Sequence, residues 1–356
     1  MTRRTVAPEE HHSAARRSNG NRKPHATIYD IARHLGVSPS TVSRALNKPG
    51  RINAKTEQRI REAAAELNYR LNPMARALPT GRTSTIGLIL SDITNPVYFT
   101  LVRGAERIAA AAGYTLVLAE SQESVELEAQ TAERLLLSVD GLVLVSSRMD
   151  DDHIEALADR KPLITVNRRV GAVPGIVPDV VPGIRDALDH LASLGHRSIA
   201  FLSGPGVSWM NELRWNTLLD EAPERGMAIV EIGPNDPTRD GGRAALRRVR
   251  ASGVTAVVTY NDLMAIGLLD AYRGAGMDIP GDLSIVGFDD IFGSDFTSPP
   301  MTTIRTPLDL AGEEAVHRLI ATTAEDAGEA GQAGAPEPRR VGTEFILRGS
   351  TAAPGR

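Results

Sequence analysis

The chain has 356 residues and a formal net charge of −4, but residues 1–83 carry 16 lysines and arginines against 6 aspartates and glutamates, and the remainder carries 24 against 38. The length exceeds one ordinary domain and allows a sizeable core, and the lack of cysteine excludes disulfides, iron–sulfur clusters and thiolate zinc sites. Because no apolar run reaches the roughly 18–20 residues of a membrane-spanning helix, and the basic N-terminus does not resemble a secretion signal, we expect a soluble cytoplasmic protein.

Residues 1–25 are rich in arginine, serine, asparagine and histidine and show no apolar periodicity, so we expect them to be disordered. His11 and His12 are adjacent but lack the spaced partners that a metal site needs. The sequence predicts no metal site and no cofactor.

The run Thr27–Asn47, TIYDIARHLGVSPSTVSRALN, predicts two short helices joined by a tight turn. Thr27 and Asp30 have the spacing of a capping box at the start of the first helix. The second helix has Ser38 as a hydroxyl N-cap and Pro39 at its first position, where the missing N–H is not needed. Together these features predict a helix-turn-helix.

The first turn of the second helix exposes short hydroxyl groups beside one long bidentate donor, Arg44. A helix enters a DNA major groove end-on with such side chains. A third helix, beginning at Asn53 or Thr56, completes a domain over residues 26–70. The positive charge at this end of the chain favours a polyanion partner, which we predict to be double-stranded DNA. The alternative, a solvated basic tail, does not explain why the charge coincides with a helix-turn-helix pattern.

Residues 71–83 are predicted to be a linker that contains a short hinge helix. Asn72 is a suitable cap, Pro73 suits the helix start, and Pro79 and Gly81 end the segment. A helix this short is unstable alone, so we expect it to form only against a partner or DNA. The alternative is a plain linker.

From Ser84 onward, short apolar strands alternate with helical patterns, which predicts buried parallel strands with connecting helices. The predicted strands are 85–91, 114–120, 141–147, 162–168, 198–204, 227–233, 256–260, 283–290 and 341–348. The predicted helices between them are 97–112, 124–138, 151–159, 183–194, 211–226, 239–252 and 262–275.

The alternation of strands and helices begins again after Val181. This indicates two successive βα halves and therefore two open parallel sheets with a cleft between them. The predicted fold is an all-α helix-turn-helix head with a hinge helix, followed by an α/β body of two doubly wound parallel-sheet subdomains. The body is expected at residues 84–351, with a first subdomain at about 84–181 plus 304–322 and a second at about 182–303 plus 339–351.

Seven segments of the sequence carry a resemblance to a known family. They are the helix-turn-helix run quoted above, AELNYRLNPMARAL, GLILSDITNPVYF, LGHRSIAFLSG, TYNDLMAIGLL, DIPGDLSIVGFDD and PPMTTIR. In this order, from about Thr27 to Thr351, they resemble the lac repressor (LacI/GalR) family of bacterial transcription regulators. The resemblance implies a repressor that binds a palindromic operator as a homodimer. It also implies a type I periplasmic-binding-protein-like body that binds a small-molecule effector, a sugar or sugar derivative.

The resemblance also assigns DNA contacts by position. It implies phosphate contacts from Tyr29, Ser38, Thr41, Ser43 and Asn47, base contacts from Pro39, Ser40 and Arg44, and minor-groove contacts from Ala75 and Leu78. Arg44 can bind O6 and N7 of a guanine, with a phosphate contact as the alternative. Leu78 occupies the place of a leucine wedge, with simple packing of the hinge helix as the alternative. The sequence departs from the family at Leu71, where proline is usual.

The resemblance implies effector contacts from six residues, most of them at strand ends: Tyr98, Phe99, Asn167, Arg214, Asn261 and Asp289. An Asp–Asn–Arg set can form bidentate hydrogen bonds to adjacent hydroxyls of a polyhydroxylated ligand. Two departures concern this pocket. Thr217 and Leu218 replace the family's glycine-aromatic pair, and residues 235–242 contain no aromatic ring, so that Trp209 or Trp215 would have to supply one. The sequence does not identify the effector, or whether it releases or promotes DNA binding.

Two other classes of protein share part of this pattern. An enzyme would need a recognisable site, and the sequence contains no GxxxxGK[ST], GxSxG or HExxH motif. Asp289 and Asp290 are adjacent at a strand end, where their carboxylates should point apart. A solute-binding protein of a transporter shares the body but not the basic head. We therefore predict a DNA-binding regulator that is not an enzyme.

Overall fold

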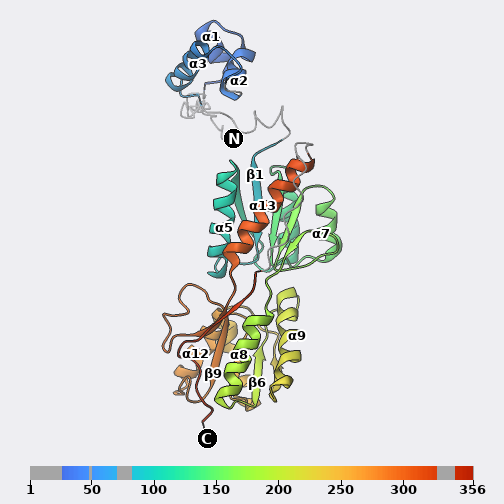
Figure 1. Cartoon of the computed structure of the whole chain (residues 1–356), viewed down its shortest axis with the longest axis vertical. Helices are drawn as coiled ribbons and strands as arrows, with labels where there is room; N and C mark the ends of the chain where they lie inside the picture. Colours follow the sequence, from blue (N-terminus) through green and yellow to red (C-terminus); the bar gives the residue numbers. More distant parts are fainter. Residues whose placement is uncertain (1–25, 48–49, 70–81, 327–340, 356) are drawn as a thin grey trace, which may run out of the picture. The chain divides into compact units, whose positions relative to one another are not determined.

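The computed structural model describes residues 26–47, 50–69, 82–326 and 341–355. The chain divides into two compact units, Met1–Pro79 and Thr80–Arg356, which we call the head and the body and describe separately (Figure 1). The N-terminal tail and the predicted hinge helix lie outside the described residues. Among the residues that are described, no helix is long and apolar enough to cross a membrane.

The described part of the head contains three helices, as predicted: α1 (Ile28–Leu35), α2 (Pro39–Asn47) and α3 (Ala54–Glu66). Helix α1 begins with the predicted capping box. The Thr27 hydroxyl accepts from the Asp30 amide, and the Thr27 amide donates to the Asp30 carboxylate at 2.9 Å. The helix ends at Gly36, whose φ of 66° is a left-handed conformation that glycine adopts without steric cost.

The core of the head is small and built mostly from alanine and isoleucine. Helix α3 starts at Asn53 rather than at the alternative Thr56, because the Asn53 side chain accepts a hydrogen bond from the Lys55 amide at 2.9 Å. The buried side chains that join the three helices are Ile31, Ala32, Val42, Ala45, Ile60, Ala63 and Ala64. The described helices of the head therefore pack around one small apolar core.

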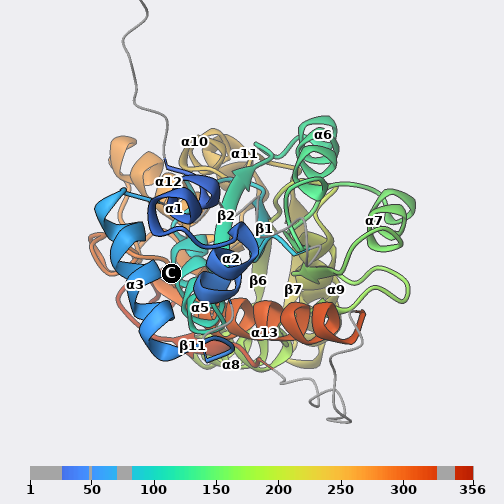
Figure 2. The ribbon, with the colours of Figure 1, turned by 90° about the horizontal axis from the view of Figure 1, so that it is seen from above.

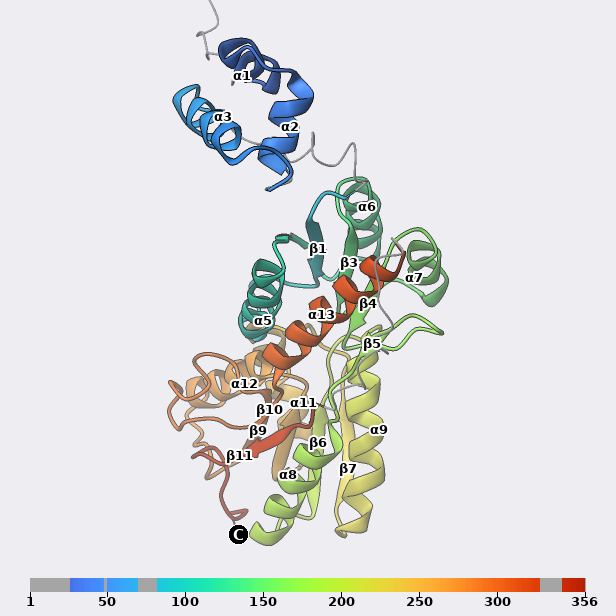
Figure 3. The ribbon, with the colours of Figure 1, turned by 45° about the horizontal axis from the view of Figure 1, so that its top comes forward.

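The described strands of the body form two sheets, one in each half of the body (Figures 1 and 3). The first has the order β2-β1-β3-β4-β5 and the second the order β11-β10-β9-β8-β6-β7. All pairs are parallel except β10 with β11. The strands are β1 (Thr85–Leu90), β2 (Thr115–Glu120), β3 (Gly141–Val145), β4 (Leu163–Val166), β5 (Gly175–Ile176), β6 (Ser198–Leu202), β7 (Ala228–Ile232), β8 (Ala256–Thr259), β9 (Ser284–Asp289), β10 (Thr302–Arg305) and β11 (Glu344–Ile346).

Helices cover the sheets, which explains why the central strands are continuous apolar runs rather than alternating ones. The helices are α5 (Val97–Ala111), α6 (Val125–Leu136), α7 (Asp151–Ala158), α8 (Val181–Leu194), α9 (Trp209–Glu224), α10 (Arg239–Ala244), α11 (Leu246–Ser252), α12 (Asp262–Gly274) and α13 (Leu308–Asp326). Each predicted strand and helix of the body thus has a counterpart in the structure.

Four elements differ from the predicted pattern. The two-residue strand β5 and the helix α13 were not predicted. Strand β10 was not predicted, and it keeps Ile304, expected in the first subdomain, in the second sheet beside β9. Its run of β-branched residues favours this extended conformation. The predicted helix 239–252 is divided at Ala245. A Cβ on Gly242 would lie 2.1 Å from the Met264 carbonyl oxygen, so this glycine allows α10 to pack directly on the backbone of α12.

Helices α5 and α13 of the first half pack together at two glycines (Figure 2). A Cβ on Gly104 would lie 2.1 Å from the Asp309 carbonyl oxygen, and a Cβ on Gly312 would lie 2.2 Å from the Leu101 carbonyl oxygen. Each glycine therefore makes room for the backbone of the other helix. The close packing fixes α5, which begins next to the carboxyl end of β1.

His196 attaches the C-terminal segment to the second sheet. This histidine is fully buried, with Nδ1 2.8 Å from the Thr255 hydroxyl and Nε2 3.0 Å from the Ala352 carbonyl oxygen and 3.1 Å from the Ser284 hydroxyl. Because a carbonyl oxygen can only accept, Nε2 carries the proton. Burial lowers the pKa of His196, since a charged ring would lose its hydration.

Acidification should therefore destabilise the body through His196. Its folded pKa lies below the unfolded value, so its contribution to stability is complete above the unfolded pKa of about 6.5 and is lost as the pH falls below that value. We expect the thermal unfolding midpoint of His196→Gln to fall less than that of the wild type between about pH 7 and about pH 5. The control is His317→Gln, at an exposed histidine on α13, which should keep the wild-type slope. Equal slopes for all three proteins would contradict the assignment.

Candidate functional site

The N-terminus of α2 forms an exposed polar surface on the head. The helix buries Val42 and leaves Ser40 and Arg44 exposed to solvent. Three hydroxyls are linked at its start, because Ser38 Oγ lies 2.9 Å from Ser40 Oγ and 2.8 Å from Thr41 Oγ1. The Thr41 amide donates to the Ser38 hydroxyl at 3.2 Å, which confirms the predicted N-cap.

The other predicted DNA contacts differ in how far they are accessible. Tyr29 on α1 is 63% exposed, whereas Pro39 and Ser43 are half-buried. Within the described ranges of the chain, the exposed Arg44 guanidinium makes no hydrogen bond and no ion pair. Its donors are therefore available to an external acceptor. Three predicted contacts lie outside what the structure describes: the Asn47 side chain, Ala75 and Leu78.

In the body, strained backbone gathers at the carboxyl ends of the strands. Of the described non-glycine residues with positive φ, six lie at or after the ends of β2, β3, β4 and β9, with φ between 51° and 105°: Gln122, Glu123, Ser146, Asn167, Asp289 and Asp290. Such conformations cost about 1–3 kcal/mol each and cluster at functional sites. Ligands of open parallel sheets also bind at the carboxyl ends of the strands. We call this region the strand-end site.

The strand ends of the two halves meet. Ile291, which follows β9 in the second half, is buried in the same apolar cluster as Val97 and Tyr98 of the first half. Leu263 and Ile266, on the helix that follows β8, pack against that cluster as well. The strand-end site is therefore formed by residues of both halves.

The first half contributes hydroxyl and amide groups to the strand-end site. The Tyr98 hydroxyl lies 2.8 Å from Ser91 Oγ, and the Asn167 side-chain amide donates to the Ser146 hydroxyl at 3.0 Å. Burial raises the pKa of Tyr98 to about 12, so its hydroxyl stays protonated. Among the described residues, buried Asn167 Oδ1 has no hydrogen-bond partner. Phe99, in contrast, is half-exposed.

The second half contributes a buried ion pair. Arg214 on α9 donates to the Asp289 carboxylate at 2.8 Å and to the Tyr260 carbonyl oxygen. Its guanidinium carbon lies 3.7 Å from the centre of the Phe288 ring, within the range of a cation–π interaction. Burial raises the pKa of Asp289, and the charge of Arg214 opposes this shift. Within the described chain, Arg214 Nε is buried without a partner.

Two further predicted features concern the neighbours of this pair. The Asn261 side chain caps α12 by accepting from the Met264 amide at 2.9 Å, and its amide donates to the Pro237 carbonyl oxygen at 2.8 Å. The side-chain oxygen and nitrogen of Asn261 are thus both engaged in hydrogen bonds within the protein. Asp290 pairs with Arg348 at 2.6 Å, away from Asp289, as expected for adjacent carboxylates at a strand end.

Arg148 lies at this edge of the first sheet and was not singled out in the sequence. Its side chain is only 2% exposed, and Nε donates to the Glu123 carboxylate at 2.6 Å. Interactions with the tyrosines Tyr98 and Tyr260 and with Glu123 raise the pKa of Arg148 despite the opposing effect of burial. Its position directly after the predicted strand 141–147 was the only signal in the sequence that could have identified it.

Tyr260, which the sequence did not single out, has its ring centre 5.1 Å from the Arg214 guanidinium carbon. It follows β8 directly, its hydroxyl lies 3.0 Å from Ser208 Oγ, and its ring occupies the space next to Gly204, where a Cβ would lie 2.5 Å from the ring. Of the two tryptophans considered, Trp215 instead stacks on Phe201 in the core, with ring centres 6.0 Å apart. Trp209 lines a cavity that is described below.

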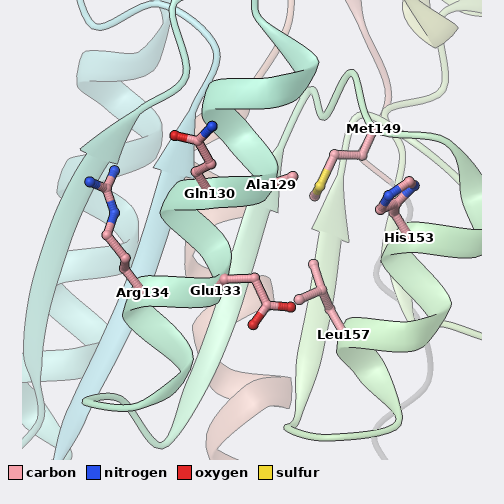
Figure 4. A pocket seen from close by; sticks show the side chains of 7 residues that line it. All are labelled: Ala129, Gln130, Glu133, Arg134, Met149, His153 and Leu157. Atoms are coloured by element: carbon pink, nitrogen blue, oxygen red, sulfur yellow. The ribbon is translucent and has the colours of Figure 1, made fainter.

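A cavity of about 530 Å³ lies between α6 and α7, away from the strand-end site (Figure 4). Met149 and Leu157 form its buried part. Its rim is charged, but Glu133 pairs with Arg160 at 2.6 Å and His153 with an aspartate at 2.7 Å. All its lining residues belong to the first half, so a molecule bound in this cavity would not contact the second half.

Comparisons with known proteins agree with this architecture. Residues 27–72 match the family described as bacterial regulatory proteins, lacI family, and residues 188–351 match a periplasmic binding protein-like domain. Catabolite control protein A of Priestia megaterium is 31% identical over 305 residues, which cover 82% of this chain and 91% of that protein.

Two solved structures extend the similarity to the fold. The lac repressor dimer bound to operator and the anti-inducer ONPF has a TM-score of 0.80 at 27% identity, covering 92% of this chain and 99% of that one. A LacI family regulator of Enterococcus faecium with bound ribose has a TM-score of 0.66 at 27% identity, covering 76% and 99%. The chain is therefore a DNA-binding transcription regulator that belongs to the lacI family.

Proposed function

We propose that this regulator is a repressor that binds a palindromic operator as a homodimer and that a small polyhydroxylated effector in the strand-end site controls its operator affinity. The observation that carries the proposal is the contrast between two arginines. Arg44 is exposed and, within the described residues, unpaired on a basic head, whereas Arg214 is buried and paired in an acidic body. The first suits a polyanion, and the second suits a ligand that is recognised by directed hydrogen bonds.

Base reading by the head rests mainly on Arg44. Its planar guanidinium can bind two acceptors of one guanine, while Ser40 discriminates weakly between bases and Pro39 has no donor. The remaining hydroxyls of α2 suit phosphate oxygens, which position the helix without reading sequence. With a net charge of +10 in residues 1–83, operator affinity should fall steeply as salt rises.

The homodimer is proposed from an apolar surface on the first half. Ile93, Phe99 and Leu118 are exposed, and the Ile93 amide donates to Glu120 of β2 at 2.9 Å, which holds its loop against that strand. In the described sheet β2 is an edge strand. Exposed apolar patches beside an open edge are typical of interfaces. The lac repressor, which has the same fold, is a dimer in its operator complex.

The effector class is proposed from the unpaired atoms of the strand-end site. Asn167 Oδ1 and Arg214 Nε are buried without partners among the described residues. Each such atom costs about 1–3 kcal/mol when it stays unsatisfied. A ligand with adjacent hydroxyls could donate to the first and accept from the second, which favours a carbohydrate. The ribose bound by the relative from Enterococcus faecium is a ligand of this class.

Replacing Arg44 tests the reading of bases. Arg44→Ala should lower the affinity for the operator by about 1–3 kcal/mol and leave non-specific binding nearly unchanged. Fluorescence anisotropy with operator and scrambled duplexes measures both affinities. The matched control is Arg59→Ala, which removes the same charge from the exposed surface of α3. If Arg44→Ala keeps the wild-type ratio of the two affinities, Arg44 contacts only phosphates.

Replacing Leu118 tests the dimer. Leu118→Glu places a charge on the exposed edge strand, so sedimentation at micromolar concentration should show a shift from dimer to monomer, with a loss of operator affinity. The control is Leu137→Glu, at the 87% exposed leucine that follows α6 as its C-cap, which should sediment like the wild type. Unchanged sedimentation of Leu118→Glu would place the interface elsewhere.

Replacing Asp289 tests the effector site. Asp289→Asn keeps a hydrogen-bond acceptor for Arg214 but removes the counter-charge of this buried guanidinium, so the variant should also be less stable and its folding is checked by thermal unfolding. We expect a panel of sugars that starts with ribose to shift operator affinity of the wild type by about 1–3 kcal/mol and to have no effect on this variant. Asp270→Asn is the control, because Asp270 pairs with Arg239 and Arg243, none of which belongs to the strand-end site. A variant at Asp289 that still responds fully would remove this residue from the effector site.

A further inference from the structure

A cavity of about 430 Å³ lies where the chain passes from the first half of the body to the second. Its size falls within the range of sites for small molecules, roughly 300–1,000 Å³. Its walls are Arg169, which follows β4, the crossover segment 177–181 between β5 and α8, and Trp209 and Leu213 on α9. Figure 3 shows β5 and the start of α9 next to each other at this junction. We call it the crossover cavity.

One wall of the crossover cavity is an apolar surface that contains an aromatic ring. Trp209 and Leu213 are four residues apart on α9 and therefore share a face of the helix. Both are partly buried and pack, together with Val177, against the core of the second half. The indole of Trp209 has no stacking partner among the described aromatic pairs, in contrast to Trp215. Because Trp209 lines the cavity, part of its indole can contact a planar ring there, in the offset or edge arrangements that aromatic side chains prefer.

The polar groups of the crossover cavity favour an anion. Arg169 is exposed, and within the described residues its guanidinium forms no hydrogen bond and no ion pair. The acidic group in the lining, Asp179, already accepts a hydrogen bond from the Val181 amide at 3.1 Å. An arginine with free donors binds carboxylate and phosphate oxygens bidentately. The lining therefore combines an aromatic ring, one cation with free donors, Arg169, and one carboxylate, Asp179, that faces the same cavity.

The crossover cavity is separate from the strand-end site. Arg214 follows Leu213 directly in sequence, but it is buried and bonded to Asp289, whereas Leu213 lines the crossover cavity. None of the six residues implied to contact the effector lines this cavity, although Trp209, considered in the sequence as a source of the missing ring, does. The cavity between α6 and α7 differs in another respect, because its lining comes from the first half alone.

The location of the crossover cavity connects it to the hinge. Asp179 lies on the crossover, and its amide donates to the Val341 carbonyl oxygen at 2.8 Å while its own carbonyl oxygen accepts from the Thr343 amide at 3.0 Å. Two passages of the chain between the halves are thus held side by side. A molecule in the cavity would contact Arg169 of the first half and Trp209 of the second. Its binding energy must therefore depend on the angle between the halves, which is the condition for a ligand to shift that equilibrium.

We propose that the crossover cavity is an accessory regulatory site for a small aromatic anion, a planar ring that carries a carboxylate or a phosphate. The ring stacks on Trp209 and the anionic group binds Arg169. The occupant changes operator affinity by favouring one arrangement of the two halves. This last step rests on the proposed function as an operator-binding repressor, whereas the binding step does not.

The test uses the full chain with Trp215→Phe, which leaves Trp209 as the only tryptophan because the chain has two. Phenyl phosphate and benzoate are titrated while Trp209 fluorescence is recorded, and phenol and inorganic phosphate serve as probes that lack the anion or the ring. We expect saturable changes with phenyl phosphate, benzoate or both, and none with the two fragments. The anion that binds more tightly identifies the acidic group. Arg169→Gln, at an exposed position, should weaken binding at least about tenfold, and calorimetry should show the same loss for Trp209→Ala.

Three results would overturn the proposal. The first is no saturable change with either aromatic anion up to about 10 mM, a limit that corresponds to very weak binding. The second is equal affinity in the wild type and Arg169→Gln. The third is loss of binding in Asp289→Asn, which would assign the molecule to the strand-end site. Operator affinity is measured separately with and without phenyl phosphate. Binding that leaves operator affinity unchanged would overturn the regulatory step, whereas failure to bind any operator would refute only the proposed function.

Discussion

The buried pair between Arg214 and Asp289 determines the chemistry of the body. Charges removed from water are tolerated only when they are paired and hydrogen-bonded, and here the guanidinium has the carboxylate at 2.8 Å, the Tyr260 carbonyl oxygen and the Phe288 ring around it. These contacts connect α9 to the ends of β8 and β9. They also leave Arg214 Nε as an unused donor within the described residues. The same desolvation that makes the pair costly to break makes it selective, because a ligand must replace the hydrogen bonds it disturbs.

The first half meets the same constraint with different groups. Arg148 is buried beside Glu123, and Tyr98 and Asn167 are hydrogen-bonded to serines. Left-handed backbone at Glu123, Ser146 and Asn167 places polar side chains at the carboxyl ends of β2, β3 and β4, at one edge of the sheet. Each half thus has a polar surface fixed by its own fold. Change between them is therefore easiest as movement of two rigid bodies, with the strain taken up by the chain passages such as residues 177–181.

Local features were predictable from sequence, and long-range ones were not. The capping box of Thr27 and Asp30 and the N-cap at Ser38 depend on residues three apart, so their spacing sufficed. The apolar runs likewise predicted the parallel strands. Strand β10 was not predicted because the short run TTIR becomes a strand only through its pairing with β9. Arg214 and Asp289 were chosen for a ligand, yet their mutual bond joins positions 75 residues apart, which no spacing rule reveals. The roles of Trp209, Trp215 and Tyr260 also depended on packing that spans many elements.

The small core of the head limits how the body can control DNA binding. Its interior consists of short, capped helices packed through alanine and isoleucine. A coupling of about 1–3 kcal/mol between effector binding and operator binding is therefore easier to achieve by a change outside the head than by a rearrangement of the head's core. Base reading by a single arginine is also too weak for one head to be specific, since a good bidentate contact provides about 1–3 kcal/mol. In the proposed dimer, specificity comes from two heads that bind together at a fixed spacing. An effector need only change how often the bodies permit that spacing, and the chemistry of α2 can remain the same in the bound and released states.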